Sequence, residues 1–365
     1  MHSTPHLSSH ARRRRLALGL ASILTLVIAS PNIRAQGCVP IKEMGDTSTA
    51  IDGVSSGPGG DRWEVSESYE HFRSYLDFVG SQDMTPKRAA LTNQVINVVD
   101  QFDTAISYNI DVRDTVSLDV AYFAATRSQL VNGLGRFKTQ SHDLGDTRIG
   151  VSRWMFNPAT SPRGNIALGV GLSVPTGKSN VKDYFHTTGG LALRNVDQSI
   201  QPGLGGWGYI GEFNAYYKVM PTTTLYANGF YMVTPQNVNG TRTTAAITSE
   251  TAYDSIYDQY ELRIGVTQQL VHFANGVLNG SFGGRWEGVP SDDLVGRSDG
   301  FRRPGYVLSI EPGLAFVLPH DSVSLSVPVA EYMNRTQSYP DTLTGGHGDA
   351  FFAKFLVLIS YSHRW

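Results

Sequence analysis

The chain has 365 residues, a formal net charge of −2 and a mean hydropathy of −0.19. A near-neutral chain with no basic block beyond its first residues argues against nucleic acid as a partner, and the modest hydropathy excludes a bundle of transmembrane helices. Glycine is abundant, with 38 residues, and there are 17 Tyr and 16 Phe. This composition fits a membrane β-barrel and a soluble β-sandwich about equally well.

Residues 1–35 have the layout of a secretory signal peptide. Four arginines at 12–15 precede an apolar stretch at 16–30, and the small residue Ala35 ends a cleavage site. The apolar stretch is short for a membrane-spanning helix, and no second long apolar run follows it. We therefore expect removal on export, with an uncleaved membrane helix as the alternative.

Residues 36–61 are predicted to form a flexible periplasmic linker. The stretch 53–60 is rich in glycine, serine and proline, and the whole segment is too short for a plug domain that couples uptake to an energy source. Cys38 has no second cysteine with which to form a disulfide. It is either an unpaired thiol or the lipid acceptor of an atypical lipoprotein box that begins at Ala35.

Residues 62–365 are predicted to form one domain of about twelve β-strands, an even number as in bacterial outer-membrane barrels. Most of the strands are long enough to cross a bilayer while tilted. The strands are expected near 62–75, 95–110, 115–126, 145–156, 165–175, 208–219, 223–234, 256–270, 277–288, 305–318, 322–334 and 351–365.

The connections between these strands alternate between short and long along the whole domain. Short turns are expected at 111–114, 157–164, 220–222, 272–276 and 319–321, and long polar segments at 76–94, 127–144, 176–207, 235–255, 289–304 and 335–350. Outer-membrane barrels have short periplasmic turns and long extracellular loops, whereas a soluble sandwich has no reason to collect its long loops at one end. The fold class is therefore predicted to be all-β, a single antiparallel transmembrane β-barrel in the bacterial outer membrane.

The last strand alternates in character and ends on an aromatic residue. Its apolar and aromatic row resembles the C-terminal signal by which outer-membrane barrels are recognised for insertion. The row consists of Phe355, Val357, Ile359, Tyr361 and Trp365. This ending predicts outer-membrane lipid and the barrel-insertion machinery as partners.

Alternation also predicts which side chains face the lumen, because successive residues of a strand point to opposite faces. The lumen-lining candidates are Asp119, Asp146, Arg148, Glu212, Lys218, Glu261, Arg263, Arg285, Glu287, Glu311 and Lys354. An Arg or Lys facing lipid at mid-depth costs roughly 2–4 kcal/mol, so inward placement needs no functional explanation. Glu261, Arg263, Arg285 and Glu287 form either a ladder of ion pairs that stiffens the wall or a polar constriction through which a solute passes.

Motifs for other chemistry are not supported. The glycines at 203–208 match a dinucleotide-binding pattern but precede a strand, and the segment 171–179 has one residue too many for a phosphate-binding loop. His71 and Ser74 are the nearest candidates for a lipid-cleaving site, but their odd spacing places them on opposite faces. We predict no catalytic residues, no metal, no cofactor and no enzymatic activity.

Several blocks of sequence resemble an outer-membrane family associated with the meta-cleavage pathway of phenol degradation. The blocks are 144–150, 163–177 and 197–207, with shorter ones at 93–97 and 324–329. The resemblance implies a channel or transporter for small solutes, including hydrophobic or aromatic compounds, by passive or facilitated diffusion, but it supplies no binding residues. The alternatives are a lipid-modifying barrel enzyme and a structural or adhesive surface barrel. The stretches 175–177 and 201–203 bracket the longest predicted loop, so they either set how it folds over the mouth or simply end strands.

Overall fold

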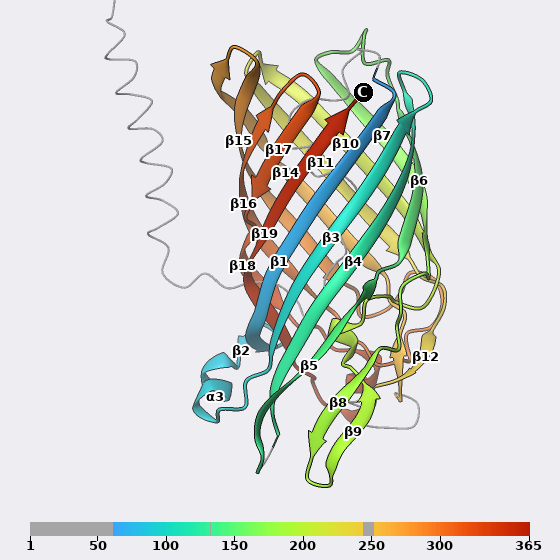
Figure 1. Ribbon diagram of the computed structural model, residues 1–365, viewed down its shortest axis with the longest axis vertical. Helices are drawn as coiled ribbons and strands as arrows, with labels where there is room; N and C mark the ends of the chain where they lie inside the picture. The colour runs from blue at the N-terminus through green and yellow to red at the C-terminus, as the bar shows by residue number, and fades with distance from the viewer. Residues whose placement is uncertain (1–60, 132, 244–251) are drawn as a thin grey trace, which may run out of the picture. The chain divides into compact units, whose positions relative to one another are not determined.

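The computed structural model describes residues 61–131, 133–243 and 252–365, so the predicted signal peptide, Cys38 and nearly all of the linker lie outside the described residues. The described chain forms a closed antiparallel barrel with twelve strand positions in its wall (Figure 1). In order around the barrel they are β1(Trp63–Val79), β3(Ile96–Asn109), β4(Asp114–Val131), β6(Thr147–Trp154), β7(Gly164–Val174), β10(Gly208–Met220), β11(Thr223–Val233), β14(Gln259–Phe273), β15(Gly276–Val289), β16(Gly305–Val317), β17(Asp321–Ser326) together with β18(Val329–Asn334), and β19(Ala350–Arg364). The predicted all-β barrel of about twelve strands is confirmed.

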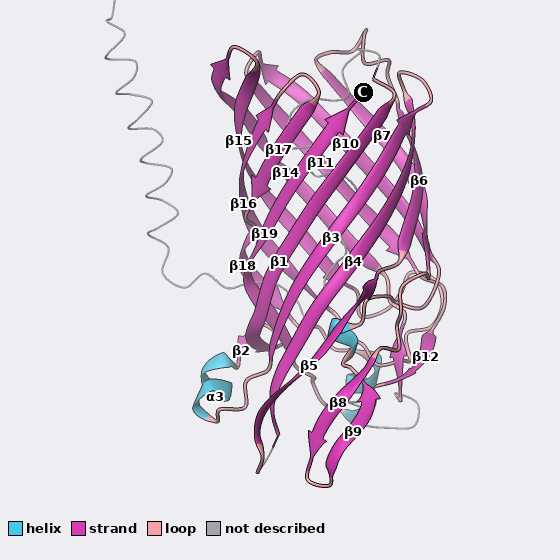
Figure 2. Cartoon of the chain, viewed as in Figure 1, coloured by secondary structure: helices cyan, strands magenta, loops and turns pink. Residues whose placement is uncertain are grey.

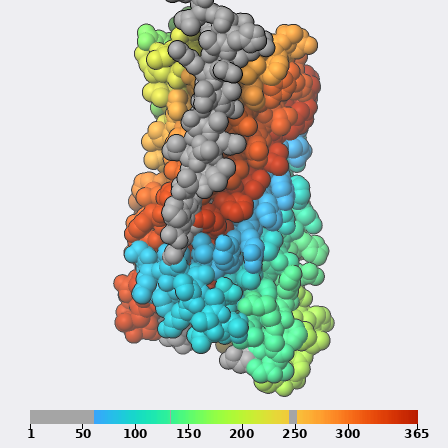
Figure 3. Space-filling view, turned by 90° about the vertical axis from the view of Figure 1, so that its left-hand side faces the viewer, coloured from blue at the N-terminus to red at the C-terminus, as the bar shows by residue number. Residues whose placement is uncertain are grey.

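The barrel closes between its first and last strands. β1 and β19 pair from Glu64 opposite Arg364 to Phe78 opposite Ala350, so no edge remains unpaired at the seam. Figure 3 shows this seam on the outer wall, where the red last strand lies against the blue first strand. A closed wall is the condition for a β-sheet to exist in lipid, since every backbone group must be satisfied within the sheet.

One predicted strand is broken in two. The segment expected as a single strand at 322–334 is β17 followed by β18, separated by Val327 and Pro328. Pro328 has no N–H to donate to the ladder, and Val327 instead donates to the carbonyl of Pro312 on β16. The two pieces still occupy one place in the barrel, between β16 and β19.

The two ends of the barrel differ as expected, but the long segments are more ordered than the sequence predicts. Much of 127–144 is strand, because β4 runs on to Val131 and pairs with β5(Gly135–Leu144) beyond the barrel. The other long connections hold β2(Gln82–Asp83), α3(Thr85–Ala90), the hairpin β8(Lys182–Thr187) and β9(Gly190–Asn195), η1(Gln198–Ile200), β12(Val238–Arg242), β13(Tyr253–Ser255) and α4(Tyr339–Thr344). The short helices all lie at this long-loop end (Figure 2). None of the described helices is long and apolar enough to cross a membrane.

The outer wall is apolar, as alternation predicts. On β7 the outward residues Leu168, Val170 and Leu172 are exposed on the outer wall. Aromatic side chains contact one another on the same wall near the strand ends, including Tyr260 with Trp286 and Trp63 with Tyr108. Such an apolar band with aromatic ends is what a barrel presents to a bilayer.

A cluster of three polar side chains interrupts this band on β1 and β3. His71 Nδ1 lies 2.8 Å from Asp100 Oδ1, and the Tyr69 hydroxyl donates to the same oxygen at 2.7 Å. The three side chains therefore satisfy one another, which lowers the cost of placing them on the apolar wall. Ser74 points the other way and is fully buried, where Asn97 donates to it at 3.1 Å.

The first prediction concerns depth in the membrane. Val170→Arg should lower the free energy of unfolding by roughly 2–4 kcal/mol, because the guanidinium would face hydrocarbon. Ile110→Arg is the matched control, since Ile110 is similarly exposed, 55% against 63%, but lies in a short turn between β3 and β4. Reversible urea unfolding in lipid vesicles measures both variants, and equal losses of stability would contradict a membrane-spanning wall.

Candidate functional site

A segment of the longest connection crosses the inside of the barrel. Residues 196–204 include η1, and we call them the crossing segment. At its start, Val196 and Ile200 pack against buried, inward side chains of β1, β3, β4 and β19: Phe72, Val99, Phe123, Ala125, Ala353, Leu356 and Leu358. At its end, Leu204 packs against Ile210, Phe230, Met232 and Val289 of β10, β11 and β15 and against Ile256 and Tyr257. These two walls lie on opposite sides of the barrel. The segment therefore spans the lumen at the long-loop end.

Asp197 anchors the crossing segment to the wall. Its carboxylate accepts two hydrogen bonds from Arg303, at 2.8 and 2.9 Å, and lies 3.5 Å from Arg127 of β4. It also caps η1 by accepting from the backbone N–H of Ser199 at 3.0 Å. Burial alone would raise the pKa of Asp197, but the two arginines outweigh burial and hold the pKa far below its usual range. The anchor is therefore ionised at any physiological pH.

Asp146 provides a second anchor at the other end of the segment. Its two carboxylate oxygens accept from the backbone N–H of Gly177 at 3.0 Å and of Leu204 at 2.7 Å. Gly203 lies so close to Gly177 that a Cβ there would collide with the Gly177 carbonyl. The stretches 145–146, 175–177 and 201–204 thus form one contact. Of the two interpretations of 175–177 and 201–203, this contact favours the one in which they set how the loop folds.

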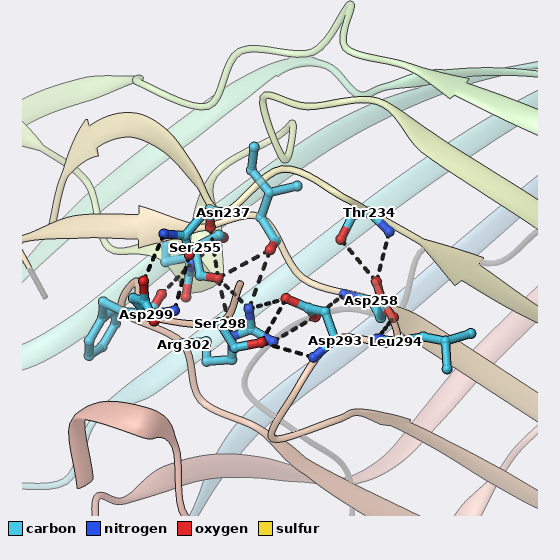
Figure 4. A network of polar contacts seen from close by, with 12 residues as sticks. Thr234, Asn237, Ser255, Asp258, Asp293, Leu294, Ser298, Asp299 and Arg302 are labelled. Carbon is cyan, nitrogen blue, oxygen red and sulfur yellow. Dashed lines mark hydrogen bonds and ion pairs between the residues drawn. The ribbon is translucent and has the colours of Figure 1, made fainter. Parts of the chain in front are cut away.

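Neighbouring loops are fastened to the crossing segment. The amide of Gln198 donates to the carbonyls of Ser255 and Phe301, at 3.0 and 3.1 Å. Figure 4 shows the next layer of this network, in which the Arg302 guanidinium lies between Asp293 and Ser255. The described parts of the connections after β11 and β15 are thereby held together with the segment as one hydrogen-bonded unit at the long-loop end.

Asp258 joins the same unit near the start of β14. Its carboxylate accepts from the backbone N–H groups of Thr234 at 2.7 Å and Leu294 at 2.8 Å (Figure 4). Tyr231 also donates to it, at 2.9 Å. These contacts tie the ends of β11 and β14 to the connection between β15 and β16.

A belt of charges lies on the inner wall below the crossing segment. Arg285 contacts Glu261 at 2.9 Å and Glu287 at 2.7 Å, and Arg263 contacts Glu261 at 2.9 Å and Glu311 at 3.5 Å. All five side chains are nearly inaccessible to solvent. The predicted interpretation as a ladder of ion pairs on neighbouring strands fits these contacts, and a buried ladder of this kind fixes its strands as much as it shapes a pore.

The remaining lumen candidates fall in different places. Asp119 and Arg148 are direct neighbours on β4 and β6, and both are buried. Glu212 lies flat against β7 because Gly169 opposite it has no side chain; a Cβ at Gly169 would collide with the Glu212 carboxylate. Lys218 lies near the short-turn end of β10 and is exposed.

Two candidates depart from the alternation that placed them on the wall. Asp146 lies between β5 and β6, where it acts as the anchor described above. Lys354 lies next to a register shift of β19, between the inward residues Ala353 and Leu356. Because three positions separate those two inward residues, strict alternation does not place Lys354 in the lumen.

The sequence missed Arg127, Asp197 and Arg303, although Asp197 falls within one of the blocks of resemblance. Arg127 and Arg303 were expected in long polar connections, and Asp197 is 106 positions from Arg303 along the chain, so no spacing rule could join them. Among the described residues, no group of three or more His, Cys, Asp or Glu is arranged to hold a metal. Asp183 and His186, three positions apart on β8, instead contact the Gln140 N–H and the Phe137 ring, respectively.

No protein-family model matches the chain, and no curated protein is similar to it. Among solved structures, the chain is similar to an outer membrane channel from Pseudomonas putida F1, with a TM-score of 0.55 over 88% of this chain and 100% of that one. The identity is 10%, so the likeness shows the fold alone, which is that of an outer-membrane β-barrel. A toluene transporter from Ralstonia pickettii is also 10% identical over 89% of this chain and 99% of its own, but its TM-score of 0.41 supports no conclusion.

The second prediction concerns pH. Burial, with the nearby charge of Asp197, raises the pKa of Asp254 from 3.8 to about 7. If the mouth opens and exposes Asp254 to water, its pKa returns to the ordinary value. Between about pH 4 and pH 7 the closed form then holds a proton that the open form releases, so closing weakens as the pH rises through this window.

The open probability in planar bilayers should therefore rise between pH 5 and pH 7, by at most tenfold for each unit. Asp254→Asn should remove this dependence, whereas Asp292→Asn, at an exposed loop position, should keep it. An identical pH profile for Asp254→Asn and the unaltered protein would contradict the assignment of the pH dependence to Asp254.

Proposed function

We propose that the protein is a passive outer-membrane channel for small hydrophobic or amphipathic solutes, which pass through the lumen when the crossing segment moves. The observation that carries the proposal is the crossing segment itself. A purely structural barrel needs no separate segment across its lumen, held by a buried carboxylate at each end. A channel that has to keep a barrier intact between transport events does.

The long-loop end is the proposed entrance on the cell surface. Long connections lie at one end and the C-terminus at the other, which supports an extracellular mouth and periplasmic termini (Figure 1). The predicted signal peptide at 1–35 and the terminal row ending at Trp365 fit delivery to the outer membrane and insertion there. Residues 36–61 would then be a periplasmic linker.

The inner surface near the mouth supports apolar solutes. Apolar side chains pack against the crossing segment from both walls, with Phe72 and Phe123 on one side and Phe230 and Met232 on the other. A solute that displaces the segment would take over these contacts, which favours molecules with an apolar body. The resemblance to the family associated with phenol degradation points the same way, toward hydrophobic or aromatic compounds.

A lipid-cleaving enzyme is the less supported alternative. His71 is oriented by Asp100 on the outer wall, as a general base would be, but the candidate nucleophile Ser74 faces inward. A nucleophile must lie within hydrogen-bond reach of its base. We therefore assign no catalytic residue.

The third prediction tests the channel. Asp146→Ala removes two buried hydrogen bonds to a carboxylate, which favours release of the crossing segment by roughly 3 kcal/mol, or on the order of a hundredfold in population. Planar-bilayer conductance should rise accordingly, and uptake of a labelled hydrophobic solute by cells with an intact outer membrane should become faster.

Asp183→Ala is the matched control, because Asp183 likewise accepts from a backbone N–H but lies on the exposed hairpin β8–β9. It should leave both conductance and uptake unchanged. The channel proposal fails if the Asp146 variant is folded yet neither conducts ions nor speeds the uptake of any solute.

A further inference from the structure

Two glutamines on opposite walls mark the boundary between the apolar contacts of the crossing segment and the charged belt. In the inward-facing row of β3, Gln101 lies between Val99, which packs on the segment, and Asp103. At the start of β14, Gln259 lies between Tyr257 of the apolar cluster and Glu261 of the belt, each two positions away. Both point inward by the alternation of their strands. Both are 1% exposed.

The two glutamines lie at about the same depth. Paired residues lead from Gln259 through Met232, Ile210, Gly171, Gly150 and Ser117 to Ser107 on β3. Because the strands are tilted, this line, followed from Gln259, moves toward the short-turn end by about 14 residues in one circuit, and by about seven in the half circuit from β14 to β3. Gln101 lies six residues from Ser107 in the opposite direction, toward the long-loop end, which offsets this shift. The glutamines therefore face each other across the lumen.

Each glutamine has a polar atom without a partner among the described residues. Gln101 donates its amide N–H to both carboxylate oxygens of Asp103, at 2.9 and 3.1 Å, which fixes the amide orientation and leaves Oε1 without a donor. Gln259 has no partner for either Oε1 or Nε2. Buried amides are normally hydrogen-bonded. Two amides at one depth with unpaired polar atoms therefore indicate that a bound molecule supplies the missing hydrogen bonds.

Most of these unpaired polar atoms are hydrogen-bond acceptors. Asp119 Oδ1, on the same inner wall, also has no donor. A solute bound here would gain by donating a hydrogen bond, whereas an anion would meet the carboxylates of Asp103 and Glu261 beside the two amides. A twelve-stranded barrel with this register is roughly 24 Å across between backbones, so one small solute would contact one glutamine at a time.

We propose that Gln101 and Gln259 are the recognition residues of the channel, and that they select neutral solutes with an apolar body and a single hydroxyl donor. The proposal rests on the proposed channel function and names its substrate class. The hydroxyl donates to a glutamine oxygen while the apolar body occupies the side that the crossing segment covers. The belt beneath then disfavours carboxylates of the same size.

The test uses three probes with one ring: cyclohexylmethanol, cyclohexanecarboxylate and methylcyclohexane. NMR titration of the full mature protein in lipid nanodiscs gives their dissociation constants. The alcohol should bind at least tenfold more tightly than the carboxylate. Gln101→Met and Gln259→Met keep the side-chain length, and each should weaken alcohol binding about fivefold to tenfold and leave methylcyclohexane within twofold.

Ser281→Ala is the control, since Ser281 faces the lumen on β15 nearer the short-turn end. It should leave alcohol binding within twofold. Heat-modifiable migration on gels shows whether each variant is a folded barrel. If one methionine variant does not fold, the other carries the test, and the preference of the unaltered protein for the alcohol over the carboxylate is measured in any case.

Two results would overturn the assignment: methionine variants that bind the alcohol as the unaltered protein does, or equal affinity for alcohol and carboxylate. Either would mean that the amides are completed by water only. The channel proposal fails separately, through the absence of solute uptake in intact cells. Glutamine-dependent binding without uptake would leave the site standing and remove the channel.

Discussion

The ionic contact of Asp197 with Arg127 and Arg303 is the interaction on which the closed mouth depends. It joins three parts of the chain that are far apart in sequence: the crossing segment, the wall strand β4 and the connection before β16. Burying such a group of charges gives little net stability, but removing one partner typically costs 3–5 kcal/mol because it leaves charge uncompensated. The main effect of this contact is therefore to hold the crossing segment in one position, and its contribution to overall stability is small.

The kind of side chain that lines the lumen changes along its length, and each layer carries the side chains that its neighbours require. Apolar side chains meet the crossing segment, two amides lie beneath them, and the charged belt follows. Small hydroxyls occupy the short-turn half, where Ser322 and Ser362 share a hydrogen bond at 2.8 Å. The belt is internally paired, so it can face the lumen without binding every ion that enters. A solute moving inward would exchange apolar contacts for hydrogen bonds step by step.

The barrel itself could be predicted from the sequence because its rules are local. Alternation along each strand places Val170 on lipid and Gly169 inside, and the loop lengths separate the two ends. Contacts made between distant segments could not be predicted in this way. Arg127 was expected in a polar loop, yet it lies on a strand that continues past the membrane and pairs with β5. The break at Pro328 was readable in principle, since proline cannot donate within a ladder.

Only part of the candidate site could be predicted from the sequence. The paired belt around Glu261 and Arg285 follows from strand register, because both residues lie on neighbouring strands of a hairpin. The orphan amides of Gln101 and Gln259 do not, since a missing partner is a property of the folded structure alone. Asp146 was predicted to line the lumen, but its partners, the N–H groups of Gly177 and Leu204, come from backbone geometry.

Movement of the crossing segment is the central claim, and a reversible cross-link tests it most directly. The Ser141 hydroxyl donates to the carbonyl of Ile200, which places β5 beside η1. In a Cys38→Ser background, Ser141→Cys with Ile200→Cys can be joined by a short, reducible thiol-specific cross-linker. We expect cross-linking to abolish solute uptake and ion conductance, and reduction to restore both. Unchanged uptake through a fully cross-linked barrel would contradict the account.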